Sequence, residues 1–497
     1  MSSPGPDGAA TSGAGARAAF LRAFPAIATA IFIAAIDTTI TATALPAIAA
    51  AFGVVDRISW VVVAYLVAAT IAAPLFGRLG DAHGRRAMLL LGFTLQALGM
   101  LGAGLAPSFE ALLAARLVQG VGGGALLTLA MAVVGETLPA RERGRYQGYL
   151  VACFMSASAA GPLAGGWLTE ALGWRAVFLA GLPLVALGAA MAWRLPRRAG
   201  AGAFRFDAPG TALFTVFVLA LVAMLDRIQA LRWEAALWAV GFALVAALAA
   251  WALLRVERRV PDPLLPIPLL AHPAIWRLSV VSACVQGVLV ALISFLPLYL
   301  YAVRGVPLAT VGAMLLPMSL GGGLGALLSG LFMARTGRNM LLASLGLSIA
   351  VLFLCGFSLL PGAVPLAWLP WLLMLMSFAF GTSFPVAQTT VQVAAGPLQL
   401  GVATASVQFM RNLGSAAGTA LLGTLLFAGF TLADPVMAER FGAVLRGGRE
   451  AMAALPEAER AAMAAGLADG YRALFAGAAV IMGVAAVMAW RVPLRRL

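Results

Sequence analysis

The sequence predicts an all-α polytopic membrane protein with fourteen transmembrane helices. Of its 497 residues, 62% are apolar and 10% are charged, whereas soluble globular chains are about 45–50% apolar and about 25% charged. Its mean hydropathy is +0.97. The apolar residues gather in runs of about 20 residues, the length that an α-helix needs to cross the hydrocarbon core of a bilayer. Water is therefore not the main solvent of this chain.

Fourteen apolar runs follow one another along the chain, separated by short polar segments. The first run, residues 22–45, is too long for a signal-peptide core and lacks a cleavage pattern, so we expect a retained helix. Pro and Gly inside several runs are compatible with helices packed in a membrane bundle. The predicted spans are 22–45, 58–77, 87–106, 110–134, 146–168, 174–193, 208–226, 235–254, 274–301, 307–333, 339–360, 365–392, 400–428 and 470–490.

An internal repeat predicts that the spans form two halves. The segment Gly77–Arg86 follows the second run, and a similar segment, Gly330–Arg338, follows the tenth. Two six-helix bundles with two inserted helices account for this spacing, and such bundles place a substrate cavity between the halves. The predicted parts are a disordered cytoplasmic tail (1–19), an N-terminal six-helix bundle (20–200), two linker helices (201–260) and a C-terminal six-helix bundle (261–497).

The second half contains a long outer loop, residues 431–472. Its charged, Ala/Met-rich stretch predicts an interfacial amphipathic helix, to which we assign no function.

The charge pattern predicts the orientation of the chain. All 33 basic residues are Arg, and the net charge is +14. With the amino terminus in the cytoplasm, 21 arginines fall in cytoplasmic segments and five in the short outer loops. Because cytoplasmic loops carry the excess of basic residues, we expect a multi-pass protein of the bacterial cytoplasmic membrane with both termini in the cytoplasm. This orientation explains the charge better than a nucleic-acid partner does.

Several function classes are excluded by composition. Without Lys there is no Walker A lysine, so we expect no nucleotide partner and no ATP-driven pumping by this chain alone. Two His and three Cys provide neither metal-ligand spacing nor a Cys/His catalytic pair. We therefore expect no enzyme activity, no metal and no cofactor, and a proton gradient as the energy source.

Asp37 is the one acidic residue that lies deep inside an apolar run. A central Asp costs about 2.5–3.5 kcal/mol on insertion scales, so its presence needs a reason. A carboxyl group in such surroundings can bind and release a proton near neutral pH. The alternative is a neutral or Arg-paired Asp that only joins two helices.

Arg116 lies at a similar depth in the fourth run. Asp37 is about 12 Å and Arg116 about 9 Å from the predicted outer ends of their helices, at 1.5 Å per residue. The spacing also puts Arg116 and Gln119 on one helix face. A cation favours the ionised form of a nearby carboxyl group, so movement of Arg116 can time proton release. Alternatively, Arg116 bonds to backbone carbonyls and closes the bundle.

Four motifs resemble signatures of the major facilitator superfamily, and the first resembles its fourteen-helix drug:proton antiporter branch. Ala82, Ala157 and Gly181 depart from the usual residues of these patterns. The motifs are Asp37-x-Thr39-Ile40 in helix 1, Gly77-x-Leu-x-Asp81-x-x-Gly84-Arg85-Arg86 after helix 2, Arg116-x-x-Gln119-Gly120 in helix 4, and the antiporter motif Gly161-Pro162-x-x-Gly165-Gly166 in helix 5. The resemblance implies the major facilitator fold, with two six-helix bundles plus two inserted helices.

The resemblance also implies roles for these residues. Asp37 and Arg116 would couple the protein to protons, and Asp81 with Arg85 and Arg86 would form charge pairs that hold the halves together in one state. The alternative for these arginines is that they only follow the charge rule of membrane topology. The remaining residues with an implied role in gating or helix packing are Gly77, Gly84, Gly161, Pro162, Gly165 and Gly166.

Polar residues inside other spans are candidates for lining a substrate cavity. The alternative is hydrogen bonding between helices. With nearby aromatic residues, such a cavity suits amphipathic or cationic organic molecules. The candidates are Gln119, Gln286, Tyr299, Gln388, Gln392, Gln408, Arg411 and Asn412.

The function that the resemblance implies is proton-coupled export of amphipathic or cationic drugs by alternating access, with Asp37 as the proton carrier. Its partners would be small substrates, protons and the lipid bilayer, and multidrug efflux would confer antibiotic resistance. Two alternatives stay open: export of a native lipid, siderophore or metabolite on the same fold, and a membrane scaffold or sensor without a transport cycle. A membrane-embedded enzyme lacks a catalytic constellation.

Overall fold

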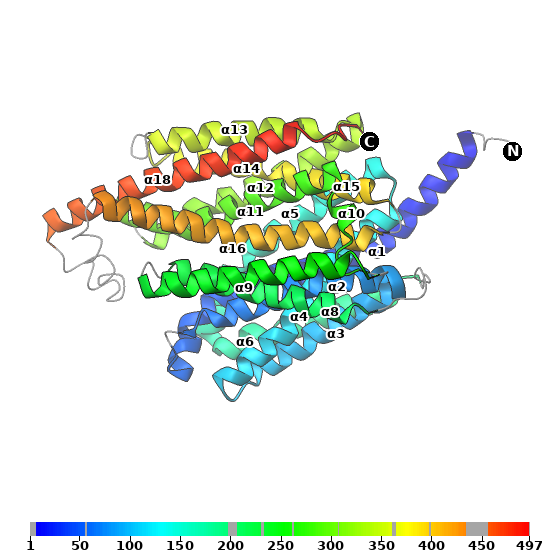
Figure 1. Cartoon of the computed structure of the whole chain (residues 1–497), viewed down its shortest axis with the longest axis horizontal. Coiled ribbons are helices and arrows are strands. Elements are labelled where there is room, and N and C mark those ends of the chain that lie inside the picture. Colours follow the sequence, from blue (N-terminus) through cyan, green and yellow to red (C-terminus); the bar gives the residue numbers. More distant parts are fainter. Residues whose placement is uncertain are drawn as a thin grey trace.

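The computed structural model describes residues 6–54, 57–196, 206–229, 233–260, 263–306, 308–359, 364–396, 399–433 and 456–496. Within these ranges, fourteen helices are long and apolar enough to cross a membrane. The predicted number of spans and the all-α membrane fold are therefore confirmed. Both termini lie at the same end of the bundle, as an even number of crossings requires (Figure 1).

The first half consists of six spans. Its sixth span is divided, because α6 and α7 meet at a short break around Ala180 and Gly181. The elements are α1 (Pro6–Phe52), α2 (Trp60–His83), α3 (Arg85–Gly104), α4 (Phe109–Thr137), α5 (Ala140–Leu172), α6 (Trp174–Leu179) and α7 (Leu182–Trp193).

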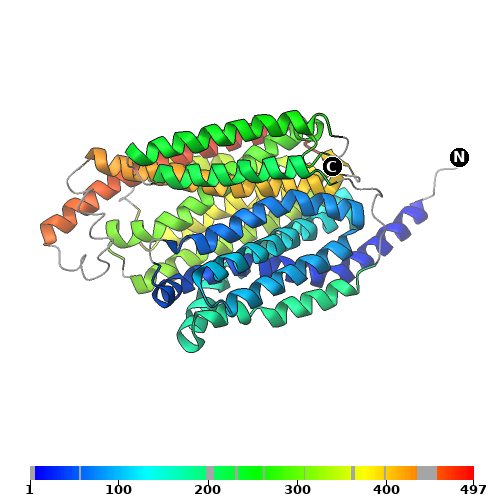
Figure 2. The same cartoon turned by 60° about the horizontal axis from the view of Figure 1, so that its bottom comes forward.

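Two inserted helices and six further spans complete the chain. The inserted pair, α8 (Ala208–Gln229) and α9 (Trp233–Glu257), lies side by side along the bundle (Figure 2). The second half contains α10 (Ile267–Leu270), α11 (Pro273–Leu298), the π-helical η2 (Tyr299–Val303), α12 (Leu308–Thr336), α13 (Met340–Leu359), α14 (Leu369–Gly381), α15 (Ser383–Ala395), α16 (Leu400–Ala433) and α18 (Glu457–Trp490).

The helix α1 is longer than the predicted first span at both ends. It begins at Pro6, where we expected a disordered tail, and the extra turns project from the bundle (Figure 1). Ala, the strongest helix former, is frequent in this stretch. At the other end α1 continues through Pro46 to Phe52, because a membrane bundle tolerates Pro inside a helix.

The long loop predicted over 431–472 is described only at its two ends. Residues 434–455 lie outside the described residues, and with them most of the predicted interfacial helix. The part from Glu457 onward is the beginning of α18, whose membrane span starts at Ala465.

The internal repeat has a structural counterpart. Gly84, between α2 and α3, has a φ of +89°, and Gly337, between α12 and α13, has a φ of +68°. Both angles lie in the left-handed region that favours glycine. The two halves therefore turn at equivalent glycines after their second helices.

The halves have separate apolar cores and meet along two pairs of helices. One core contains Phe20, Phe93 and Leu129 of the first half, and another contains Leu292, Phe380 and Leu474 of the second half. Between the halves, α5 packs on α12 and α2 packs on α16. The inserted α8 contacts both α2 and α16, so the inserted pair covers one of these seams.

Glycines bring the two halves close together at one end of the bundle. A Cβ atom on Gly77 of α2 would lie 2.7 Å from the carbonyl oxygen of Gly401 on α16, and one on Gly148 of α5 would lie 2.8 Å from that of Ala326 on α12. A Cβ on Gly330 of α12 would collide with the backbone of Gly144 on α5. These contacts lie toward the end that carries the arginine-rich loops.

Candidate functional site

Asp37 of α1 and Arg116 of α4 form a buried ion pair. The Nη1 atom of Arg116 lies 3.0 Å from Oδ2 of Asp37, and the Nε2 group of Gln119 donates to Oδ1 at 2.6 Å. The exposed fractions of the three side chains are 2% for Asp37 and 0% for Arg116 and Gln119. The structure thus brings together the three residues that the sequence places at one depth.

The remaining contacts of Arg116 come from the first turns of α2 and from α6. Its Nε group donates to the carbonyl of Val61 at 3.1 Å. Its guanidinium carbon lies 4.5 Å from the ring centre of Tyr65 and 5.7 Å from that of Phe178. The cation is therefore held by a carboxylate, a carbonyl and two aromatic faces, which replace the water it has lost.

Small residues on α4 make this arrangement possible. A Cβ atom on Gly120 would lie 2.8 Å from the Cβ of Ala68, and one on Gly124 would lie 2.8 Å from the Cα of Ala69. Larger side chains would push α4 away from α2 and lengthen the contact from Arg116 to Val61. Gly120 and Gly124, four residues apart, thus form a surface of small residues on which α2 packs closely.

Two polar atoms in this cluster lack a hydrogen-bond partner in the described part of the chain. They are Nη2 of Arg116 and Oε1 of Gln119, and both are buried. An unpaired buried polar group raises the free energy of the state that contains it. A different conformation that provides hydrogen-bond partners for Nη2 of Arg116 and Oε1 of Gln119 would remove this cost.

The Gly-Pro motif of α5 packs directly on the helix that carries Asp37. A Cβ atom on Gly161 would lie 2.8 Å from Cβ of Thr39, and one on Gly165 would lie 2.7 Å from the carbonyl oxygen of Ile40. Pro162 and Gly166 of the same motif are exposed, and a Cβ on Gly166 would meet nothing within 4 Å. Two of the four motif residues therefore make the close contact with α1.

Asp81 joins the two halves. Its carboxylate accepts a hydrogen bond from the backbone N–H of Gly401, with distances of 3.1 and 3.2 Å to its two oxygens. Gly401 is in the first turn of α16, where the helix dipole and the free N–H groups favour a negative charge. Asp81 is also paired with Arg85, which donates to the carbonyl of Gly77 at 3.3 Å.

Arg85 and Arg86 bond within the first half, which differs from the expectation that they pair across the halves. The Nε atom of Arg85 lies 3.5 Å from Glu136 of α4. Arg86 donates to the carbonyl of Leu195 at 3.0 Å and lies over the ring of Trp193. The crossing contact is made by Asp81 because it reaches a backbone N–H group, which a sequence motif does not reveal.

Four of the cavity candidates lie near one another in the second half. Arg411 of α16 donates to Oε1 of Gln286 on α11, with distances of 3.2 Å from Nη2 and 3.4 Å from Nε. Gln408 donates to Asn412 at 3.0 Å, and Asn412 donates to the hydroxyl of Thr70 on α2, also at 3.0 Å. All four candidates are partly exposed, whereas most polar groups around them are buried or bonded within the bundle.

The other candidates are packing residues. Gln388 and Gln392 donate to the hydroxyl of Thr404 at 3.0 and 3.1 Å, and Gln392 also donates to the carbonyl of Met131 on α4 at 2.9 Å. Both are buried. Tyr299 is fully buried, with its ring against Tyr471. These residues join helices, as the alternative interpretation predicts.

Several partners of the predicted residues are not evident from the sequence. Val61 and Tyr65 hold Arg116, Thr70 links the halves through Asn412, and the carbonyl of Met131 accepts from Gln392. Thr70 could have been identified, because a hydroxyl group within an apolar run suggests a hydrogen bond. The carbonyls of Val61 and Met131 could not, because every residue has a backbone carbonyl. Among the described residues, no group of three His, Cys, Asp or Glu side chains is placed to hold a metal ion.

Comparisons with known proteins agree with this fold. A family model described as Major Facilitator Superfamily matches residues 27–419. The uncharacterized MFS-type transporter MT1926 of Mycobacterium tuberculosis is 33% identical over 441 residues, covering 87% of this chain and 62% of that protein. Multidrug resistance protein 3 of Bacillus subtilis is 28% identical over 407 residues, covering 81% of this chain and 78% of that protein.

Solved structures show the same architecture. The human organic anion transporter MFSD10 matches with a TM-score of 0.65 at 16% identity, covering 94% of this chain and 99% of that one. The proton:xylose symporter XylE matches with a TM-score of 0.60 at 14% identity, covering 96% of each chain. The chain spans 62% of the length of its mycobacterial relative. With its two six-helix halves and a family match over most of its length, the chain belongs to the Major Facilitator Superfamily.

Proposed function

We propose that the protein exports amphipathic compounds in exchange for protons by alternating access, with Asp37 as the proton carrier. The observation that carries this proposal is the buried cluster of Asp37, Arg116 and Gln119. An ion pair inside a membrane bundle is expensive, and removing the charge of one member leaves the other uncompensated, at a cost of about 3–5 kcal/mol. Protonation of Asp37 is such a removal, so it destabilises this conformation.

Protonation of Asp37 can affect α5 through the direct contact between α1 and α5. Thr39 is two residues from Asp37 and packs on Gly161, so a shift of α1 moves the helix that carries the antiporter motif. The helix α5 in turn packs on α12 of the second half. In the proposed cycle, proton binding to Asp37 is therefore transmitted to the seam between the halves.

The described conformation has its halves joined at the arginine-rich end. If that end faces the cytoplasm, as the charge rule predicts, this is the state closed toward the cytoplasm. Opening it requires the contacts between the halves near this end to break, among them Asp81 with Gly401 and Gln392 with the carbonyl of Met131. Each proton that crosses with 100 mV supplies about 2.3 kcal/mol, comparable to the loss of a few such hydrogen bonds.

The substrate class of the proposal is supported by the relatives and by the polar residues of α16. Two relatives from Bacillus subtilis are named a multidrug resistance protein and a multidrug transporter protein, at 28% and 27% identity. The partly exposed Gln286, Gln408 and Asn412 offer hydrogen-bonding groups, and neighbouring Arg411 lies over the aromatic ring of Phe384. We place the protein in the cytoplasmic membrane of a bacterium, with both termini inside.

A second candidate function is export of an anionic metabolite, and one observation favours it. Arg411 contacts Gln286 and lies 4.7 Å from the ring centre of Phe384. Among the described residues, no carboxylate forms an ion pair with Arg411. A partly exposed cation without a carboxylate partner among the described residues is suited to a carboxylate or sulfonate of a substrate.

The test of the main proposal is dye transport in inverted membrane vesicles. A pH gradient should drive uptake of a cationic dye by the native protein, and Asp37→Asn should abolish the response to the gradient. Energy-independent exchange of the dye should persist in Asp37→Asn, which shows that the variant is folded. Glu110→Gln, at an exposed ion pair with Arg57, is the control and should transport normally. Undiminished proton-driven uptake by Asp37→Asn would overturn the mechanism.

A further inference from the structure

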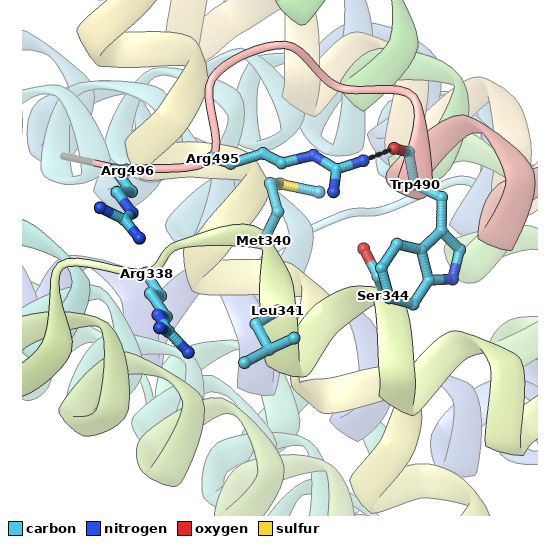
Figure 3. Close-up of a pocket in the computed structure, with 7 residues that line it drawn as sticks. All are labelled: Arg338, Met340, Leu341, Ser344, Trp490, Arg495 and Arg496. Atoms are coloured by element: carbon cyan, nitrogen blue, oxygen red, sulfur yellow. Dashed lines mark hydrogen bonds between the residues drawn. The ribbon is translucent and has the colours of Figure 1, made fainter.

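Three arginines surround a cavity at the end of α13 and α18 (Figure 3). Arg338 precedes α13, and Arg495 and Arg496 follow α18 near the carboxyl end of the chain. The cavity has a volume of about 200 Å³. The other lining residues are Met340, Leu341, Ser344 and Trp490.

Backbone contacts hold the carboxyl-terminal segment in place. Arg338 and Arg496 form an antiparallel bridge, and the N–H group of Asn339 donates to the carbonyl of Arg495 at 3.3 Å. The side chain of Asn339, which is 1% exposed, donates to the carbonyl of Leu494 at 2.9 Å. The arginines are therefore brought together by a folded segment and not by a flexible tail.

Within the described residues, the three arginines have no carboxylate partner. All three arginines are exposed, and in the described ranges none of them forms an ion pair with a carboxylate. Arg495 donates to the backbone carbonyl of Trp490, which leaves its charge unneutralised (Figure 3). Like charges held close together repel one another, so an anion bound between them lowers the free energy of this arrangement. The fork of each guanidinium group matches the oxygens of a phosphate.

The position of Trp490 at the end of a membrane span indicates that the phosphate belongs to a lipid. Trp490 is the last residue of a membrane-spanning helix, and its indole N–H donates to Ser348 at 3.2 Å. Trp side chains prefer the level of the lipid headgroups. Met340, Leu341 and the ring of Trp490 supply apolar surface beside the arginines. A ligand with a phosphate joined to acyl chains satisfies both parts of the cavity, whereas a free phosphate uses only one.

We propose that Arg338, Arg495 and Arg496 form a binding site for the phosphate of an anionic phospholipid. The topology rule places basic residues at this end of the bundle, but it does not require a bridge between two of them or a cavity among three. The site is separate from Asp37 and from the seam between the halves, so it does not depend on the proposed transport function.

Lipid binding to the purified full-length protein tests the proposal. The measurement is the number of phosphatidylglycerol molecules retained after detergent exchange, by native mass spectrometry, with phosphatidylcholine as the neutral comparison. The native protein should bind phosphatidylglycerol at least about tenfold more tightly than phosphatidylcholine, because arginines close to the membrane surface attract an anionic headgroup. The triple variant R338Q/R495Q/R496Q should lose this preference.

A matched control removes three exposed arginines elsewhere. Arg194, Arg258 and Arg259 lie on loops of the first half and of the inserted pair, so R194Q/R258Q/R259Q changes the net charge equally. This control should keep the preference for phosphatidylglycerol. An equal loss in both triple variants would show general charge attraction and overturn the site. The single variant R496Q, with a smaller loss, repeats the test if the triple variant fails to fold.

Competition separates the lipid from a soluble anion. Millimolar inorganic phosphate should leave bound phosphatidylglycerol in place, because it lacks the acyl chains that contact Trp490 and Leu341. Displacement of the lipid by inorganic phosphate alone would assign the arginines to a soluble anion and overturn the proposal.

Discussion

The Nη1 atom of Arg116 lies 3.0 Å from the Oδ2 atom of Asp37, and both side chains are buried. The two residues come from helices that are not neighbours in sequence, and Gln119 supplies the second hydrogen bond to the carboxylate. The pair is electrically neutral only while Asp37 is ionised. Binding of a proton to Asp37 therefore gives the buried pair a net positive charge. This change is the physical basis of the proposed coupling between proton binding and conformation.

The first prediction concerns the stability of this pair. Asp37→Asn and Arg116→Gln should each lower the melting temperature of the purified protein, because each leaves a buried group uncompensated, at about 3–5 kcal/mol. The double variant should be less destabilised than the sum of the two single variants. Thermal unfolding in detergent, monitored by circular dichroism, measures all three.

The exposed pair of Arg57 and Glu110 is the control for this cycle. Its side chains are 61% and 70% exposed, and the N–O distance is 3.7 Å. Glu110→Gln should change the stability by less than about 1 kcal/mol. Additive effects of Asp37→Asn and Arg116→Gln would contradict the view that the two side chains act as one unit.

The second prediction concerns the contact of Asp81 with Gly401. Asp81→Asn removes the negative charge at the start of α16, an interaction of about 0.3–1 kcal/mol, or up to about 2 kcal/mol when partly buried. The population opened at this end should rise, about fivefold for each kcal/mol. A cysteine at the buried Ala405, which faces Gly77, reports this opening through its labelling rate in a background without Cys153, Cys284 and Cys355.

Asp469→Asn is the control for Asp81→Asn. Asp469 pairs with Arg472 inside α18, near the start of its membrane span, and both side chains are about half exposed. It should leave the labelling of the Ala405 position unchanged. An unchanged labelling rate in Asp81→Asn itself would show that its contact does not hold the halves together.

The third prediction separates two glycines of one motif. Gly161→Ala places a methyl group 2.8 Å from Cβ of Thr39, and overpacking of this kind costs about 1–3 kcal/mol. Transport should fall about tenfold while the protein still folds. Gly166→Ala meets nothing within 4 Å and should transport at the native rate. Equal activity of both variants in vesicles would rule out the packing of α5 on α1 as a working contact.

The fourth prediction concerns the charge of the substrate. Arg411→Gln should reduce export of an anionic dye and spare a cationic dye if Arg411 receives an anionic group. Arg255→Gln removes a charge at the far end of α9, where Arg255 lies over Trp251, and should affect neither dye. Export of both dyes at native rates by Arg411→Gln would remove the second candidate function.

The spans could be predicted because each is a long apolar run. The pair of Asp37 and Arg116 could be predicted because a charged residue is conspicuous within such a run. Asp37 and Arg116 are charged groups in runs that are otherwise apolar, and only a partner makes them tolerable there. The family motif around Asp81 likewise pointed to a contact between the halves. The motif did not reveal that the carboxylate of Asp81 accepts a hydrogen bond from the backbone N–H of Gly401, because every residue except Pro has such an N–H group.

Sequence alone determined the number and order of the membrane spans, the repeat and the charged residues Asp37 and Arg116 in the middle of two spans, because each depends on local hydropathy or on a short motif. Tertiary structure decided which polar residues stay partly exposed: Arg411 and Asn412 do, whereas Gln392 and Tyr299 are buried in packing contacts. It also assembled the arginines around Trp490. Lipid and protein interior are equally apolar, so a membrane helix shows little contrast between its faces, and long-range packing makes the choice.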